Sequence, residues 1–375
     1  MDHLIWIETR RRPTGFTLLE LFFVIATIMI LVGLLLPAMR TSSVAARRMS
    51  CSNNFKQVGL AMHLYHTSYQ QLPPAMGGTG SFSGDDQGTS HWRDNAGRLS
   101  GLVAMLPYLE QQALWDQINS PLQDASVTYP AMGPAPTRAT YDPWATQISV
   151  LRCPSDPAEP TPFGLTNYAF CIGDAGRDLY HEKTSDSGEL LPPRGVFAAA
   201  SQRQTRFKDV LDGLANTIAM TEIANRSDRM IKGSYLVEQP VAFLDAPQDA
   251  RQFVDPQRPA FYVEEAPLSE LGRGGRWADG AAGVALINTI LPPNQISFAV
   301  DGLDAVDGVY SGGSHHAGGM HVLMADGAVK FITDSIESGD FGASAPNAWS
   351  DRASPYGLWG TLGTAACDDS VDGFE

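Results

Sequence analysis

An apolar run close to the N-terminus constrains this chain more than any other feature of its sequence. From Leu21 to Leu36 every residue except Thr27 is apolar or glycine. Together with residues 16–20 the run has the length that a helix needs to cross a bilayer core, roughly 20 residues. Three arginines at positions 10–12 precede it, and the positive-inside rule keeps such residues on the cytoplasmic side. The sequence therefore predicts a single-pass protein of the inner (cytoplasmic) membrane, with everything after the run outside the cytoplasm.

Two features distinguish this run from an ordinary signal peptide. No cleavage site of the small-x-small type closes it, and a carboxylate, Glu20, lies at its beginning. An acidic group costs about 2.5–3.5 kcal/mol at the centre of a membrane helix, so such a residue usually has a function. The order Gly15-Phe16-Thr17-Leu18-Leu19-Glu20 resembles the processing motif of type IV prepilins and of type II secretion pseudopilins.

This resemblance implies a maturation step and a set of partners. A prepilin peptidase would cut between Gly15 and Phe16 and methylate the new amine. Glu20 would then pair with the N-terminal amine of a neighbouring subunit, or direct methylation and assembly with other pilin-like subunits. The alternative is a signal anchor that is never cleaved.

The helix is expected to continue beyond the membrane, because residues 38–69 contain no proline. Cys51, Phe55, Val58 and Met62 follow one another at steps of four and three, which places them on one face of a helix. One long helix over about residues 17–69 is predicted, with its second half packed on a sheet. The expected organisation is a leader over 1–15, a transmembrane part over 16–37, a soluble half-helix over 38–70, an extracytoplasmic domain over 71–336 and a disordered tail over 337–375.

The expected fold class is α+β, with mainly antiparallel pairing and large loop insertions. A helix is predicted over 102–118. Short apolar segments between turn residues predict strands, at 148–153, 195–200, 217–222, 233–238, 296–300, 320–325 and 328–333. Asp326-Gly327 lies between the last two of these, and an Asp-Gly pair in that position predicts a hairpin with a type I′ turn.

Several short segments of the sequence, taken together, resemble the motifs of one family. They are Cys51-Ser52-Asn53-Asn54-Phe55, Leu106-Pro107-Tyr108-Leu109-Glu110-Gln111, Cys153-Pro154-Ser155-Asp156, Thr166-Asn167-Tyr168, and His316 followed after nine residues by Asp326-Gly327. The chain resembles the DUF1559 family, the large prepilin-like proteins abundant in planctomycetes, over roughly residues 10–336. The resemblance implies a type IV pilin-like fold and an export route, and it implies no molecular activity.

The net charge and the positions of the cysteines limit the possible partners and disulfide pairings. The formal net charge is −15, which repels phosphate backbones and argues against nucleic acid as a partner. Four cysteines occur without a CxxC pair, so three full disulfide connectivities are open. The family motifs favour a bridge between Cys51 and Cys153, with Cys153 to Cys171 as the alternative and Cys367 left as a free thiol.

The sequence indicates candidate sites in the extracytoplasmic domain less strongly than it indicates the processing motif. His315, His316, His321 and Asp326 suggest a metal or catalytic group, but a structural role is preferred. Asp301, Asp304 and Asp307 are weak calcium candidates without the EF-hand spacing, and no other cofactor is expected.

No nucleophile elbow, P-loop, dinucleotide fingerprint or HExxH motif is present in the sequence, so no enzyme activity is expected. The predicted function is that of a pseudopilin-like subunit of a pilus or of a type II secretion-like assembly. The alternative is an anchored extracellular binding module for a glycan, a peptide or a cation.

Overall fold

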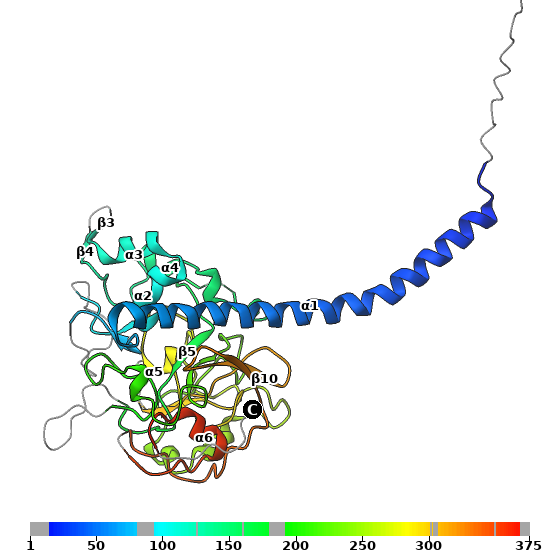
Figure 1. Ribbon diagram of the computed structural model, residues 1–375. Coiled ribbons are helices and arrows are strands. Elements are labelled where there is room, and N and C mark those ends of the chain that lie inside the picture. Colours follow the sequence, from blue (N-terminus) through cyan, green and yellow to red (C-terminus); the bar gives the residue numbers. More distant parts are fainter. Residues whose placement is uncertain are drawn as a thin grey trace, which may run out of the picture. The chain divides into compact units, whose positions relative to one another are not determined.

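The computed structural model describes residues 15–80, 94–124, 127–159, 161–179, 192–300, 302, 307–348 and 350–367, without the side chains of residues 34–41. The chain divides into two compact units, residues 1–47 and residues 48–375 (Figure 1).

The long helix α1 (Leu18–Tyr69) contributes to both units. Its bounds agree with the predicted helix over about 17–69. The helix ends where Gln70 adopts a left-handed φ of 57° and its N–H bonds to the carbonyl oxygen of His66 at 2.7 Å. Pro73 and Pro74 follow, and neither can continue a helix.

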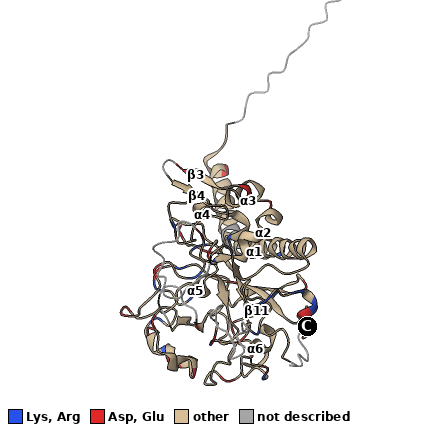
Figure 2. Ribbon diagram, turned by 90° about the vertical axis from the view of Figure 1, so that its left-hand side faces the viewer, with Lys and Arg blue, Asp and Glu red and all other residues tan. Residues whose placement is uncertain are grey.

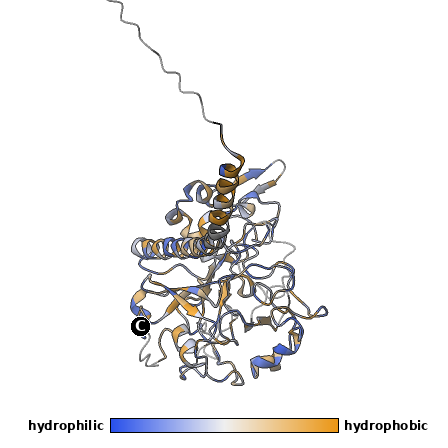
Figure 3. Cartoon of the chain, turned by 90° about the vertical axis from the view of Figure 1, so that its right-hand side faces the viewer, coloured by the Kyte–Doolittle hydropathy of each residue, from blue (hydrophilic) through white to orange (hydrophobic). Residues whose placement is uncertain are grey.

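In the first unit, α1 exposes its apolar side chains. Leu18, Leu19, Phe22, Phe23 and Ile30 are all more than half exposed, as is Phe16 just before the helix, and this part of the helix is strongly hydrophobic in Figure 3. Within the part of the chain that the structure describes, no helix is long and apolar enough to span a membrane.

The second unit is built on a five-stranded sheet with the order β11-β10-β6-β5-β7. The strands are β5 (Tyr168–Cys171), β6 (Ile218–Glu222), β7 (Leu286–Ile287), β10 (Gly319–Met324) and β11 (Val329–Thr333). All neighbouring pairs are antiparallel except β5 with β7. The predicted α+β class with mainly antiparallel pairing is therefore confirmed.

The remaining elements are short. Three two-stranded sheets pair β1 (Met76–Gly77) with β2 (Leu99–Ser100), β3 (Leu122–Asp124) with β4 (Val127–Tyr129), and β8 (Phe298–Ala299) with β9 (Gly308–Val309). The short helices are α2 (Gly101–Met105), α3 (Gln112–Asn119), α4 (Asp142–Ala145), α5 (Ala282–Ala285) and α6 (Gly357–Gly363), with 3-10 turns at Leu106–Leu109, Ser149–Leu151, Phe207–Asp209, Val241–Leu244 and Pro247–Phe253.

The second half of α1 lies between the sheet and the small helices (Figures 1 and 2). Toward the sheet, the ring of Phe55 stacks on Tyr168 of β5 with ring centroids 4.4 Å apart. A Cβ added at Gly59 would lie 2.7 Å from Leu323 Cδ1 of β10, so the glycine permits this close approach. Toward the small helices, Tyr65 meets Tyr108 edge to face at 6.1 Å. This half-helix is therefore covered on two sides by its own chain.

Several local predictions are wrong for identifiable reasons. The predicted strand at 148–153 is a 3-10 turn, Ser149–Leu151, and the true strand β5 was missed because all four of its residues are buried and show no alternation. The hairpin between β10 and β11 exists, but its turn is not type I′. Only Gly327 has a positive φ, of 91°, while its N–H bonds to Met324 and Met324 pairs with Ala328. This is a three-residue loop that closes with glycine in a bulge.

The C-terminal segment is not a disordered tail as far as Cys367. Helix α6 packs Trp359 and Leu362, both fully buried, against strands β6 and β10. The indole N–H of Trp359 donates to the carbonyl oxygen of Leu291 at 2.9 Å. The prediction failed because the segment is rich in glycine, serine and aspartate, which weakens every local signal. Residues 368–375 lie outside the described part.

Candidate functional site

The predicted processing motif begins α1. Gly15 and Phe16 are exposed and precede the helix. Thr17 occupies the N-cap position, and its hydroxyl accepts a hydrogen bond from the N–H of Glu20 at 3.2 Å. The carboxylate of Glu20 in turn accepts from the N–H of Thr17 at 2.9 Å and from its hydroxyl at 2.8 Å. This reciprocal pair is a capping box, which satisfies backbone donors that the first turn of a helix otherwise leaves unpaired.

The capping box gives Glu20 a local role that sequence reasoning missed. The signal was present, since threonine followed three residues later by glutamate precedes an apolar helix. A carboxylate in the first turn is also stabilised by the helix dipole. Glu20 therefore has a structural reason to be acidic in the isolated chain, beside any role toward a second subunit.

A second group of residues surrounds a disulfide in the other unit. Cys51 and Cys153 are bonded, with their Cα atoms 5.0 Å apart and a separation of 102 positions in sequence. This is the pair that the family motifs favoured, and Cys171 and Cys367 remain buried thiols. The bridge joins α1 to the loop that precedes β5. Tyr168 of β5 adds a hydrogen bond from its hydroxyl to the carbonyl oxygen of Cys51 at 3.3 Å.

A buried carboxylate with two histidines lies against this disulfide. Glu222, the last residue of β6, is 1% exposed. Its Oε1 lies 3.3 Å from His316 Nε2 and 3.1 Å from His321 Nδ1, and its Oε2 accepts from the N–H of His321 at 2.7 Å. His316 Nε2 is also 3.6 Å from the sulfur of Cys153. The cluster therefore connects the disulfide, β6 and β10 through polar side chains.

The two histidines keep the buried carboxylate charged. Burial by itself raises the pKa of Glu222, but the hydrogen bonds and charges of His316 and His321 outweigh that effect and hold the pKa below its usual value. Removing either histidine would leave a carboxylate in the core with fewer donors, which is costly.

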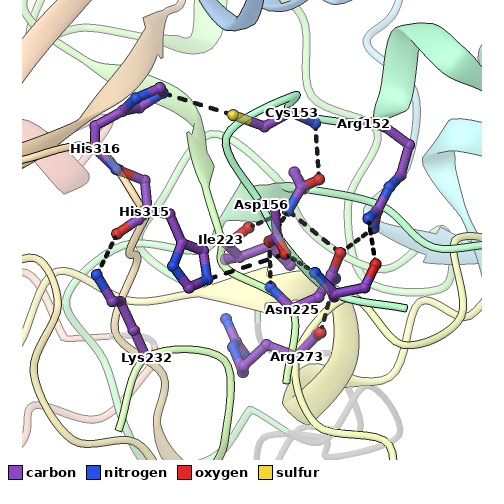
Figure 4. Close-up of polar contacts among 12 residues, drawn as sticks. Arg152, Cys153, Asp156, Ile223, Asn225, Lys232, Arg273, His315 and His316 are labelled. Carbon is purple, nitrogen blue, oxygen red and sulfur yellow. Dashed lines mark hydrogen bonds and ion pairs between the residues drawn. The ribbon is translucent and has the colours of Figure 1, made fainter. Parts of the chain in front are cut away.

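A network of amides on the other side of Cys153 explains two more family motifs (Figure 4). The carboxylate of Asp156 accepts from the side-chain amide of Asn167 at 2.6 Å and from the N–H of Asn225 at 2.8 Å. The side-chain oxygen of Asn167 accepts from the N–H of Cys153 at 2.8 Å. The Cys-Pro-Ser-Asp and Thr-Asn-Tyr phrases thus lock together and fix the position of the disulfide.

The Asp-Gly part of the C-terminal motif has a separate task from His316. The carboxylate of Asp326 accepts from the N–H of Ala328 at 2.8 Å within the hairpin turn. Gly327 lies close to α1, since a Cβ there would be 3.1 Å from His63 Nε2. The turn therefore packs on the helix, and the structure does not bring Asp326 into the histidine cluster.

The calcium candidates are only partly described. Asp301 and Asp304 lie outside the described residues. The carboxylate of Asp307 accepts from the N–H groups of Leu179 at 2.9 Å and Asp178 at 3.2 Å, so it has a structural role in fixing that segment. Calcium binding stays a prediction.

Four side chains have the composition of a metal site. Ligand atoms of Cys51, Cys153, Glu222 and His316 lie within 4.8 Å of one another. While the disulfide is closed the two sulfurs are not thiolates, which are the metal-binding form of cysteine. Glu222 was missed at the level of the sequence because a glutamate at the end of an apolar strand carries no signal that it is buried.

The comparison with known families covers the part of the chain that contains this site. The family model described as "Protein of unknown function (DUF1559)" matches residues 44–339. The chain belongs to the DUF1559 family. The match contains the disulfide, Glu222 and both ends of the His316 motif. The predicted match began near residue 10, whereas the observed match begins at residue 44, after the prepilin-like motif. No curated protein and no solved structure matches this DUF1559 chain.

One described pocket lies at the end of α1. It has a volume of about 50 Å³ and lies between segments 71–74, 198–200 and 203–205. Pockets that hold drug-sized ligands measure roughly 300–1,000 Å³, so this one suits small solvent molecules rather than a glycan or a peptide.

Proposed function

We propose that this DUF1559 protein is a prepilin-like envelope protein, matured by a prepilin peptidase between Gly15 and Phe16 and anchored in the inner membrane by the first half of α1. The second half of α1 would hold the domain outside the cytoplasm in a pilin-like arrangement, a long helix on an antiparallel sheet. A structural subunit needs no catalytic group, and we propose none.

The observation that carries this proposal is the exposure of the apolar side chains that follow Gly15. Leu18 is 86% exposed, Phe16 is 72% exposed and Ile30 is 65% exposed. Contiguous apolar surface on this scale belongs in a membrane or against other apolar helices. In the sequence the same run continues to Leu36 with Thr27 as its one polar residue, which is long enough for a span of roughly 20 residues when residues 16–20 are included.

The disulfide supports an extracytoplasmic domain. Structural disulfides persist in oxidising compartments and are rare in the cytosol. The bridge between Cys51 and Cys153 lies C-terminal to the apolar run. It therefore lies on the side that the three arginines at 10–12 predict to be outside the cytoplasm.

The position of Glu20 close to the expected new N-terminus supports a role for this end of the chain in assembly. Cleavage after Gly15 would place the new amine on Phe16, next to Thr17 and its hydrogen-bonded partner Glu20. A methylated amine keeps its positive charge, and a cation near a carboxylate at low dielectric is strongly attracted to it. The amine of one subunit and Glu20 of another would be complementary in a bundle of such helices.

Mass spectrometry of the mature N-terminus from native membranes tests the proposal. We expect a chain that begins with methylated Phe16. Gly15→Val should abolish this processing, because a branched side chain would stand directly before the cut. Gly33→Ala is the matched control, since a Cβ at Gly33 meets nothing within 4 Å. An intact Met1 in the wild-type protein would reject the proposal, as would normal processing of Gly15→Val.

A further inference from the structure

The four side chains around the disulfide come from four separate parts of the domain. Cys51 is on α1, Cys153 lies in the loop before β5, Glu222 ends β6 and His316 precedes β10. All four are buried, with exposures of 0%, 5%, 1% and 7%. Their sulfur, oxygen and nitrogen atoms lie within 4.8 Å of one another. Two cysteines, a histidine and a carboxylate are a ligand set that suits Zn²⁺ and other thiophilic divalent cations.

The distances between these atoms can be compared with the edges of a zinc tetrahedron. Bond lengths of about 2.3 Å to sulfur, 2.0–2.1 Å to nitrogen and 2.0–2.2 Å to oxygen give edges of about 3.5–3.6 Å between sulfur and nitrogen. The same lengths give about 3.3–3.5 Å between nitrogen and oxygen. The observed distances are 3.6 Å from Cys153 Sγ to His316 Nε2 and 3.3 Å from His316 Nε2 to Glu222 Oε1. Two edges therefore already have the required length.

The largest change that a metal would require is the opening of the disulfide. The two sulfurs would move from bonding distance to about 3.8 Å, the edge between two thiolates on one zinc ion. Since the Cα atoms are 5.0 Å apart, a change of side-chain rotamers can supply much of this separation. Neither α1 nor the loop before β5 needs to leave its place.

Hydrogen bonds from neighbouring residues already orient the ligands. The N–H of His321 donates to Glu222 Oε2 at 2.7 Å, which fixes the carboxylate while Oε1 faces His316. The N–H of His316 donates to Ser314 Oγ at 3.1 Å and restrains its backbone. The N–H of Cys153 donates to Asn167 at 2.8 Å. Such outer contacts hold metal ligands in position and raise affinity.

We propose that reduction of the Cys51–Cys153 bond converts this cluster into a zinc site made of Cys51, Cys153, His316 and Glu222. A dithiol reductant supplies two electrons and two protons, the sulfur–sulfur bond breaks, two thiols form and the dithiol becomes a disulfide. Zn²⁺ then displaces the two thiol protons into solvent. The disulfide and the metal are mutually exclusive, and each joins α1 to the loop before β5.

The test uses the purified full chain in detergent, in its oxidised form and after reduction and removal of the reductant. Both forms are incubated with ZnCl₂ and passed through a desalting column, and bound zinc is measured by mass spectrometry. We expect about one zinc per chain in the reduced form and essentially none in the oxidised form. With CoCl₂ the reduced form should show the d–d bands of tetrahedral Co²⁺ and a thiolate charge-transfer band.

Substitutions separate this site from adventitious binding. His316→Ala and Glu222→Gln should each lose most of the bound zinc after reduction. His315→Ala is the matched control, because its side chain contacts Asp156 at 4.0 Å and is not among the four ligands. Near-UV circular dichroism of each oxidised variant shows whether the fold survives the substitution. If His316→Ala fails this check, His316→Gln replaces it.

Three results would overturn the proposal. Zinc retained equally by the oxidised protein would show that the disulfide does not compete with the metal. Zinc retained by reduced and folded His316→Ala, or by its His316→Gln replacement, would place the metal elsewhere. A reduced wild-type chain that neither binds zinc nor shows the cobalt bands would leave the cluster as a structural contact only.

Discussion

The two halves of α1 belong to one continuous helix, but the first half exposes its large apolar side chains and the second half buries an apolar stripe. In the first half, large apolar side chains such as Leu18 and Phe23 are 86% and 61% exposed. In the second half, Cys51, Phe55, Val58 and Met62 are completely buried. The sequence of the first half is apolar on all sides, whereas that of the second half alternates between a buried stripe and polar residues.

The difference shows what each half needs for stability. The second half obtains its apolar contacts from its own chain, with β5 and β10 on one side and the small helices on the other. The first half has no such cover among the described residues of its unit, and its exposed apolar side chains are the surface that the proposed anchor would bury in lipid or against other chains. Substitutions in the two halves should therefore differ in their effect on the stability of the domain.

The largest expected effect is on the buried half. Phe55→Ala removes a completely buried ring that stacks on Tyr168 at 4.4 Å, and such truncations cost about 3–5 kcal/mol. Phe23→Ala is the matched control in the exposed half and should change the free energy of unfolding of the domain by less than about 0.5 kcal/mol. Denaturant unfolding in detergent, followed by near-UV circular dichroism, measures both. Equal destabilisation by the two variants would contradict the contrast.

A buried ion-pair cluster that joins Arg98, next to β2, to the segment before α5 should show a pH-dependent effect. The carboxylate of Asp279 lies 2.9 Å from Arg98 and 2.7 Å from Arg276. Burial raises the pKa of Asp279, but the two guanidinium groups outweigh it and hold the pKa below the usual value. Asp279→Asn removes the charge that faces the buried Arg98 and the partly buried Arg276, and breaking a buried pair in this way costs about 3–5 kcal/mol at neutral pH.

The sign of the pH dependence follows from the depressed pKa. A carboxyl group with a lower pKa in the folded state stabilises the protein above its unfolded pKa of about 3.9 and loses this contribution as pH falls through the folded pKa. The gap in unfolding free energy between wild type and Asp279→Asn should therefore be constant near neutral pH and shrink below about pH 4. A gap that widens in acid would contradict this account of the cluster.

Removal of the disulfide should destabilise the domain by a similar amount or slightly less. Replacing Cys51 and Cys153 together by alanine removes a cross-link over 102 residues. Loss of a native disulfide typically costs about 2–5 kcal/mol, and the chain-entropy model gives about 4.7 kcal/mol for a loop of this size. Chemical denaturation of the oxidised double variant measures the loss. Cys171→Ala is the control for a buried cysteine outside the bridge, and a loss there as large as in the double variant would contradict the cross-link account.

The contrast between the halves also explains what could be predicted from sequence. The helix bounds and the hairpin of β10 and β11 could be predicted, because they depend on local periodicity and on turn residues that are adjacent in the sequence. Strand β5 could not be predicted, since Tyr168–Cys171 is buried on both faces and has no alternation. The packed segment around Trp359 could not be predicted either, because its stability comes from β6 and β10 rather than from its own residues.

The residues of the candidate site also differ in whether they could be predicted from the sequence. The Cys51–Cys153 pairing was accessible through the motifs of the family. Glu222 was not, because its partner His321 lies 99 residues away and nothing near Glu222 in sequence indicates burial. The capping role of Glu20 could have been found, since its partner Thr17 is three residues away.

The smallest expected effect on stability concerns the first turn of α1. Glu20 is both a charge and a capping acceptor, and two substitutions separate these roles. Glu20→Gln retains the side-chain acceptor of the capping box and loses the charge, whereas Glu20→Ala loses both. Hydrogen exchange of the first-turn amides should report a loss of about 0.5–1 kcal/mol for Glu20→Ala and less for Glu20→Gln, with unchanged unfolding of the domain in both.

The same two variants should differ from wild type in assembly. Membrane insertion should be unchanged, but both variants should fail to enter assemblies in crosslinking experiments, because a neutral side chain cannot pair with the amine of a neighbouring subunit. If Glu20→Gln assembles normally, Glu20 matters as a helix cap, and the exposed half of α1 recognises its partners through apolar contacts alone.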